Sequence, residues 1–248
     1  MLGRVARRGR KKGVRWRRWA WRGLGAVVAF VIGLTAVPLL WLRWQPPWFT
    51  AFTLHSRFAD PAPGEPCRDV DYQWVSWQRI SPHVARAVVA AEDQRFLLHD
   101  GFDFGAIEQA VVDRVTGESG RLRGASTLTQ QLAKNLFLWP GRSVARKGLE
   151  AWYTGWLELA LPKRRILELY LNVAQLGPCR FGVEAAAEHF FGHGASELDA
   201  GQAALLAAVL PNPAKMRIDA PGPYTLARAR EIQELVAASR DASWLRGL

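Results

Sequence analysis

The clearest feature of the hydropathy pattern is one uninterrupted apolar run near the N-terminus. Residues 23–42 (GLGAVVAFVIGLTAVPLLWL) contain no charged side chain. A helix of about 20 residues spans the roughly 30 Å hydrocarbon core of a bilayer. The apolar region of a cleaved signal peptide is shorter, about 7–15 residues, and ends in small residues. Because this run ends in WLRW at residues 41–44, we predict an uncleaved transmembrane anchor over residues 23–44, in preference to a signal peptide or a buried core helix.

From Ser81 onward the apolar positions follow the spacing of helices. Ser81 and Pro82 are a favourable N-cap and first helical residue, and the first predicted helix extends to about Arg95. Further predicted helices, separated by Gly and Pro signals, cover residues 104–115, 126–138, 143–161, 163–173, 183–191, 198–209 and 225–239. Residues 72–77 are the only strand candidate, and residues 45–69 resemble a proline-rich juxtamembrane linker. We predict a single, mainly α domain over residues 70–248.

Positive charge is concentrated in a tail over residues 1–22. The tail holds ten of the 33 Lys and Arg residues and no acid, which leaves 23 cations against 22 acids in the rest of the chain. A near-neutral folded domain argues against a nucleic-acid binder, despite the formal net charge of +11. By the positive-inside rule we expect the tail in the cytoplasm, against anionic lipids, and the domain outside it. Tryptophans flank the apolar run as interfacial anchors would: Trp16, Trp19, Trp21, Trp41, Trp44 and Trp48.

The cysteines and one histidine pair form no recognisable motif. Cys67 and Cys179 would lie in an oxidising compartment and are free to pair, but two cysteines so far apart give no spacing pattern, so no disulfide is predicted. His189 and His193 have the i, i+4 spacing of a metal pair. Since Gly192 between them is expected to end the helix, we interpret them as structural.

An acidic segment, EDQRFLLHDGFD at residues 92–103, is one candidate for catalysis. Glu92, Phe96 and His99 fall at i, i+4 and i+7, hence on one face of a predicted helix, and Gly101 is a natural end for it. A carboxylate beside an aromatic ring and an imidazole is a setting in which a glutamate pKa rises toward that of a general base. The alternative is a solvated acidic helix end with His99 as a cap, and these residues alone do not decide between the two.

Two further segments carry cations. GASTLTQQLAKN at residues 124–135 places Thr127, Gln131 and Lys134 on one helical face near a helix N-terminus, which suits a diphosphate. The alternative there is a capping box between Thr127 and Gln130. RKGLE at residues 146–150 pairs two cations with a carboxylate, which in isolation is most often a surface ion pair.

Taken together, these segments resemble the family 51 glycosyltransferases, in particular the monofunctional biosynthetic peptidoglycan transglycosylases. The family patterns E-D-x-x-F-x-x-H-x-G, G-x-S-T-x-T-Q-Q-L-x-K-N-L, R-K-x-x-E and I-L-E-x-Y-L-N match residues 92–103, 124–138, 146–150 and 165–177, and residues 181–192 and 205–213 resemble the closing helices. Some family members have Glu where this chain has Gln175. Ordered motifs over roughly residues 70–220 are far more specific than any one of them.

The resemblance implies a lysozyme-like helical fold of two lobes, one of which enters the membrane. It also implies polymerisation of lipid II into β-1,4-linked glycan strands for cell wall biosynthesis, with inversion at the anomeric carbon and release of undecaprenyl diphosphate. Glu92 would be the general base and Glu150 a second site carboxylate. The substrate-binding positions implied by the motifs are Asp93, Phe96, His99, Gly124, Ser126, Thr127, Gln131, Lys134, Asn135, Arg146 and Lys147.

We expect no required cofactor, although a divalent cation, Mg or Mn, on the diphosphate is compatible with the reaction and no dedicated ligand cage is visible. The implied partners are lipid II, the growing glycan strand and membrane lipids, with other cell wall synthesis or division proteins as candidates and no nucleic acid. The implied location is the bacterial cytoplasmic (inner) membrane, crossed once, with the catalytic domain on the periplasmic side. The S-x-x-K and K-T-G transpeptidase motifs of bifunctional relatives do not occur in the sequence.

Two other interpretations stay open. A lytic transglycosylase or lysozyme shares the fold and a catalytic glutamate, but an enzyme that cleaves glycan has no diphosphate to neutralise. The cation-rich segments over residues 124–135 and 146–150 therefore argue against it. A catalytically silent anchor that recruits other wall proteins through its tail is disfavoured by the intact set of acidic, hydroxyl and cationic residues.

Overall fold

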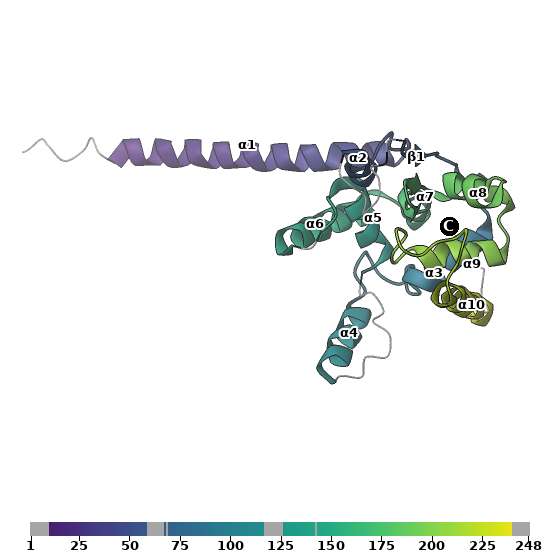
Figure 1. Ribbon diagram of the computed structural model, residues 1–248. Coiled ribbons are helices and arrows are strands. Elements are labelled where there is room, and N and C mark those ends of the chain that lie inside the picture. Colours follow the sequence, from purple (N-terminus) through teal and green to yellow (C-terminus); the bar gives the residue numbers. More distant parts are fainter. Residues whose placement is uncertain (1–9, 59–66, 68, 117–125, 142, 240–248) are drawn as a thin grey trace, which may run out of the picture.

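The computed structural model describes residues 10–58, 67, 69–116, 126–141 and 143–239. Figure 1 shows one long helix, α1 (Arg10–Leu42), which extends from a folded body containing the other elements. An 18-residue window within its segment Trp16–Leu42 has a mean hydropathy of 2.3, and the segment is long and apolar enough to cross a membrane. The predicted span is present as a helix and fits a single-pass anchor, and the change from basic to apolar sequence falls within that one helix.

The folded body is mainly helical, as predicted. Its helices are α2 (Ala51–Phe58), α3 (Pro82–Glu92), α4 (Phe104–Thr116), α5 (Leu128–Phe137), α6 (Val144–Ala160), α7 (Lys163–Val173), α8 (Val183–Phe191), α9 (Ala200–Val209) and α10 (Pro223–Ala238). The 3-10 turns η1 (Trp77–Arg79) and η2 (Ala195–Glu197) and the strands β1 (Asp71–Tyr72), β2 (Gln175–Gly177) and β3 (Arg180–Phe181) complete it. Helices α7 and α8 have the predicted bounds, and the other predicted helices differ by at most three residues at either end.

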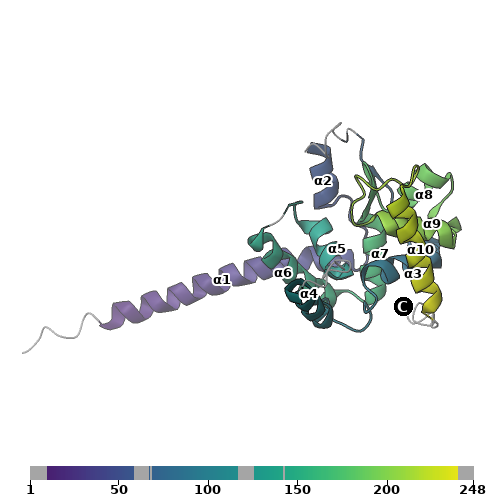
Figure 2. The ribbon, with the colours of Figure 1, turned by 60° about the horizontal axis from the view of Figure 1, so that its bottom comes forward.

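The helices pack as two groups on either side of α7 (Figure 2). In one group α3, α9 and α10 pack together, and α9 presents buried alanines that let its neighbours approach closely: Ala203, Ala204, Ala207 and Ala208. In the other group α5 packs on α6, beside the C-terminal end of α1. Every residue of α7 from Ile166 to Val173 is buried, so this helix forms the centre of the core.

The C-terminal end of α1 is fixed to the body by direct contacts. Leu39 and Leu42 are buried in the core. Arg43 Nη1 donates a hydrogen bond to Ala160 O at 2.7 Å, and Arg165 Nε donates one to Leu42 O at 2.8 Å. These cations satisfy carbonyl groups that are left open where α6 and α1 end. The direction in which the span leaves the body is therefore set by α6 and α7.

Helix α2 lies in the segment predicted as an irregular linker. Thr50 and Thr53 cap its start reciprocally, since Thr53 N donates to Thr50 Oγ1 at 3.0 Å and Thr50 N donates to Thr53 Oγ1 at 2.8 Å. This arrangement satisfies two amides at the helix N-terminus. The helix packs on α5, so part of the predicted linker belongs to the folded body.

A small sheet connects the segment before α3 to the connection between α7 and α8. Strand β3 pairs in parallel with β1 and antiparallel with β2. The strand predicted over residues 72–77 was wrong in extent, because the structure has only Asp71–Tyr72 in a strand and then turns into η1. Strands of two or three residues contain too little alternation for a sequence pattern to locate them.

Cys67 and Cys179 form a disulfide, with their Cα atoms 5.5 Å apart. This bond was not predicted from the sequence, because the two cysteines are brought together only by the pairing of the strands. Asp71 N donates to Cys179 O at 2.9 Å, which places β1 beside the turn that carries Cys179. The bond ties the beginning of the segment before α3 to the turn between β2 and β3.

Replacement of both cysteines (Cys67→Ser with Cys179→Ser) should lower the unfolding free energy by about 2–4 kcal/mol, because the disulfide closes a long loop of the unfolded chain. Unfolding in detergent, with and without reductant, measures the effect. Reductant should destabilise the wild type and leave the double variant unchanged. Equal stability of the oxidised wild type and the double variant would show that the bond does not stabilise this fold.

Candidate active site

Glu92 is the last residue of α3, and a loop follows it. Asp93 leaves the helical conformation, with φ −158° and ψ 75°. Its Oδ2 accepts a hydrogen bond from Leu128 N at 3.0 Å, and its Oδ1 lies 3.0 Å from His99 Nε2. The prediction that Glu92, Phe96 and His99 share one helical face is therefore wrong, because these tertiary contacts of Asp93 replace continuation of the helix.

The far end of this loop is held by two side chains. Lys163 Nζ donates to His99 O at 2.6 Å, and Thr127 Oγ1 donates to Gly101 O at 2.7 Å. Gly101 has φ +86°, and a Cβ on it would come within 2.7 Å of the Thr154 methyl group, so only glycine fits here. The loop that follows Glu92 is therefore held at both ends, by Asp93 at its start and by Gly101 at its far end.

The carboxyl group of Glu92 faces α5. Gln131 Nε2 donates a hydrogen bond to Glu92 Oε2 at 2.7 Å. Burial raises the pKa of Glu92 above its usual value, and the hydrogen bond from Gln131 and the positive charges of Arg228 and Lys134 oppose that shift, while Asp93 adds to it. A carboxyl group with a raised pKa, kept near cations, can take a proton from a neutral hydroxyl group close to neutral pH.

Two cations share one buried carboxylate at the start of α6. Glu150 is 3% exposed, and its Oε2 accepts a hydrogen bond from Arg146 Nη1 at 2.8 Å. Lys147 Nζ forms an ion pair with Glu150 Oε1 and donates to Ser126 Oγ at 3.2 Å. Since Glu150 neutralises only one of the two cations, this group has a net positive charge.

Lys134 on α5 adds a third cation within electrostatic range of this group. Burial lowers the pKa of Lys134, Glu150 and Glu92 raise it, and Arg146 and Lys147 lower it. Within the described residues, the buried Nε of Arg146 has no hydrogen-bond acceptor. A buried, charged donor without a partner costs free energy unless an anion supplies the acceptor. We call Lys134, Arg146 and Lys147 the cation cluster.

Three residues around the site were not singled out from the sequence. Tyr170 donates from its hydroxyl group to Gln131 Oε1 at 2.9 Å, Arg228 Nη2 donates to Ala91 O at 3.0 Å, and the ring of Phe52 lies 5.5 Å from Lys134 Nζ. Tyr170 lies inside a matched motif, but nothing in the sequence says which way it points. Arg228 and Phe52 come from α10 and α2, outside the motifs that suggested the site.

Other predicted site residues have structural contacts. Thr127 and Gln130 form the capping box of α5, which was the alternative interpretation of that segment. Phe96 is fully buried, and Asn135 is buried on α5. Gly124 and the turn predicted around it lie outside the described residues. Substrate contacts of these residues stay predictions.

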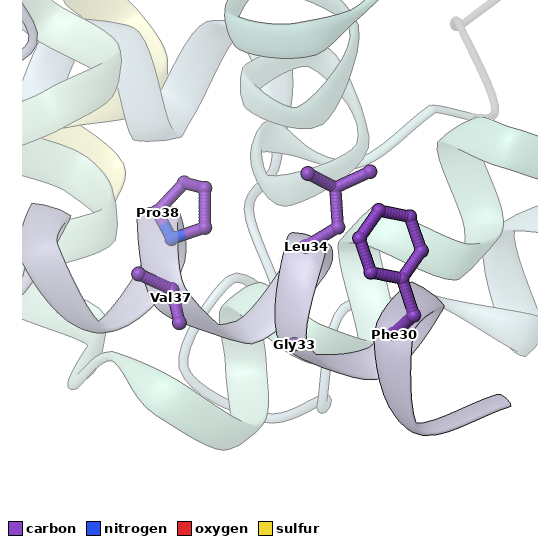
Figure 3. A pocket seen from close by; sticks show the side chains of 5 residues that line it. All are labelled: Phe30, Gly33, Leu34, Val37 and Pro38. Atoms are coloured by element: carbon purple, nitrogen blue, oxygen red, sulfur yellow. The ribbon is translucent and has the colours of Figure 1, made fainter. Parts of the chain in front are cut away.

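No group of three or more His, Cys, Asp or Glu side chains that could hold a metal ion occurs among the described residues. Gly192 ends α8 in the left-handed conformation, as expected from its position between His189 and His193. His193 Nε2 instead lies 3.0 Å from Gln202 Nε2. An apolar hollow lined by Phe30, Gly33, Leu34, Val37 and Pro38 lies on α1 itself, away from these polar groups (Figure 3).

Comparison with known proteins finds similarity along most of the chain. A family model described as transglycosylase matches residues 63–239. The biosynthetic peptidoglycan transglycosylase of Stutzerimonas stutzeri (strain A1501) is 48% identical over 211 residues, which is 85% of this chain and 86% of the relative. Proteins of the same name from Xylella fastidiosa (strain M23) and Shewanella amazonensis are 56% identical over 162 residues and 46% identical over 227 residues. These matches cover 65% of this chain and 66% of the Xylella protein, and 89% of this chain and of the Shewanella protein.

Thr127→Ala should lower the unfolding free energy by about 1–2 kcal/mol, because it removes both the cap of α5 and the hydrogen bond to Gly101 O. Thr127→Ser keeps the hydroxyl group and is the matched control. Denaturant unfolding of the three proteins measures the difference. Unchanged stability of Thr127→Ala would leave the hydroxyl group free for a role with substrate alone.

Proposed function

The chain belongs to the transglycosylase family, and on that premise we propose that it polymerises lipid II with Glu92 as the general base. It is a peptidoglycan transglycosylase with the lysozyme-like helical fold of that family. The donor would be the growing glycan strand on undecaprenyl diphosphate, and the acceptor the 4-hydroxyl group of lipid II. The observation that carries the proposal is a carboxyl group with a raised pKa, Glu92, within electrostatic range of the partly unpaired cation cluster.

In the proposed step, the acceptor oxygen forms a bond to the anomeric carbon as that carbon loses its bond to the diphosphate oxygen. Glu92 takes the acceptor proton during attack, and the electron pair of the broken bond leaves with the diphosphate. Displacement of an α-linked diphosphate from the opposite face gives a β-linked product. Because diphosphate is already a good leaving group, neutralisation of its charge replaces the general acid that glycosidases need.

The cation cluster is the proposed partner of the diphosphate. Glu150 holds Arg146 Nη1 and Lys147 in place, so that two cations are kept together for the anionic oxygens of the diphosphate. The charges of Glu92 and Glu150 both raise the pKa of Lys134, so this cation interacts with the proposed base as well as with the carboxylate that pairs with Arg146 and Lys147. Glu150 then acts by positioning cations. A divalent cation on the diphosphate would be brought by the substrate, and the expectation that none is required stays a prediction.

We also propose a single pass through the cytoplasmic membrane, with residues 1–22 in the cytoplasm and the folded body outside. The excess of cations before the apolar span supports this orientation by the positive-inside rule. The Cys67–Cys179 disulfide supports it independently, since such bonds persist in oxidising compartments. Contacts with anionic lipids and with other cell wall synthesis or division proteins stay predictions.

Glu92→Gln should abolish glycan synthesis from purified lipid II while lipid II binding persists, because the amide keeps the shape of the side chain but cannot accept the proton. Gel analysis of the glycan product and a separate lipid II binding assay make the comparison. Glu197→Gln, which changes an exposed carboxylate on η2, is the control and should remain active. Near-normal polymer from Glu92→Gln would exclude Glu92 as the base.

Lys134→Ala should reduce kcat/KM for lipid II by about 10- to 1000-fold, as expected when one preorganised charge on a leaving group is removed. Steady-state polymerisation kinetics in detergent give the value. Arg164→Ala removes an exposed cation from α7 and should have little effect. If both variants were equally active, the diphosphate would not be bound at Lys134.

Release of soluble muropeptides from purified sacculi would instead indicate a glycan-cleaving enzyme.

A further inference from the structure

Three side chains from three helices form a hydrogen-bonded chain that ends at Glu92. Tyr170, in the middle of α7, is 1% exposed, and its hydroxyl group donates to Gln131 Oε1 at 2.9 Å. Gln131, on α5, donates from Nε2 to Glu92 Oε2 at 2.7 Å. Both polar ends of the Gln131 amide are therefore engaged, one by the phenol and one by the carboxyl group.

We propose that Tyr170 is a positioning residue for Glu92, because it fixes the orientation of the Gln131 amide so that the NH2 group faces the carboxylate. This inference rests on the proposed role of Glu92 as the base. Tyr170 has no contact with Glu92 in this chain of bonds except through Gln131, so its effect on catalysis would be indirect.

The opposite orientation of the amide is unfavourable at the carboxylate, because it would place the carbonyl oxygen of Gln131 against oxygens that only accept. At the other end it would break the hydrogen bond that Tyr170 donates to Gln131 Oε1, and the phenolic hydrogen would have to turn away before the oxygen could accept from the NH2 group. Burial, and then the charge of Glu92, raise the pKa of Tyr170 well above its usual value. The phenol therefore keeps its proton throughout the pH range in which a glutamate titrates, and it remains a donor to Gln131 Oε1.

The orientation of the amide matters because a donor stabilises the ionised carboxyl group, whereas an acceptor stabilises the protonated one. The charged and titratable groups that act on Glu92 come from four directions: Asp93 on its own loop, Lys134 on α5, Tyr170 on α7 and Arg228 on α10. Among the described residues no hydrogen bond reaches Glu92 Oε1. Gln131 thus holds one oxygen of the ionised base and leaves the other for the acceptor hydroxyl group.

The test is the pH dependence of kcat/KM for purified lipid II between about pH 5 and about pH 9, for the full chain in detergent. Activity falls as pH drops and Glu92 becomes protonated. Tyr170→Phe should move this acid limb up by about half a pH unit or more, so that activity on the limb falls about threefold, with recovery at high pH and unchanged KM. Tyr153→Phe, which alters a ring stacked on Phe137, is the control and should keep the wild-type profile.

A second pair of proteins tests whether Tyr170 acts through the amide. Gln131→Leu should show the raised acid limb by itself, and Gln131→Leu with Tyr170→Phe should show the same limb as Gln131→Leu alone. The double variant loses both polar partners together and leaves no unpaired carbonyl, so it folds even if Tyr170→Phe alone is too unstable to assay.

Two results overturn the inference. One is a wild-type acid limb in Tyr170→Phe, and the other is a limb in the double variant that differs from that of Gln131→Leu. If Glu92→Gln is inactive, either result rejects the role of Tyr170 and leaves Glu92 as the base. If Glu92→Gln is active, the proposed base and the positioning role fall together.

Discussion

The carboxylate of Asp93 connects three parts of the site, and the path of the chain around Glu92 depends on it. One oxygen accepts the hydrogen bond from Leu128 N at the start of α5, and the other lies against His99 in the following loop. A negative side chain at a helix N-terminus is favoured by the exposed amides and the helix dipole. The same contact ends α3 at Glu92 and sets where α5 begins beside it. Gln131, one turn into α5, then lies opposite the carboxyl group of Glu92.

Near this junction, the positive charges outnumber the buried carboxylates that pair with them. Glu150 is almost fully buried and is paired with Arg146 and Lys147, so its charge is compensated. Removal of one partner from such a buried group leaves an uncompensated charge and is strongly destabilising. The cations outnumber the carboxylates at this end of α6, however, and the buried Arg146 Nε has no partner among the described residues. The excess positive charge costs free energy, which other interactions of the fold offset. It also gives an anionic ligand a favourable place to bind.

The sequence predicted the ends of helices correctly where local residues mark them. It did not predict the ends that are determined by tertiary contacts. Helices α7 and α8 were predicted to the residue, since Pro162 precedes one and Gly182 and Gly192 flank the other. The end of α3 at Glu92 has no such marker, because the side chain of Asp93 and its distant partners determine it. For the same reason the sequence singled out Glu92 and the residues of the cation cluster, whereas Tyr170 lies inside a matched motif but was not singled out. The disulfide and the short sheet depend on pairing between segments far apart, which periodicity does not reveal.

Helix α7 relates the anchor to the site. At one end of α7, Arg165 donates to Leu42 O and to Gln45 O at 2.8 Å each, and so holds the chain where it leaves α1. One to two turns further along, Tyr170 reaches Gln131 and thereby Glu92. Because one helix contacts both the end of α1 and the residues around Glu92, the position of Glu92 relative to the apolar span is set by packing in the core.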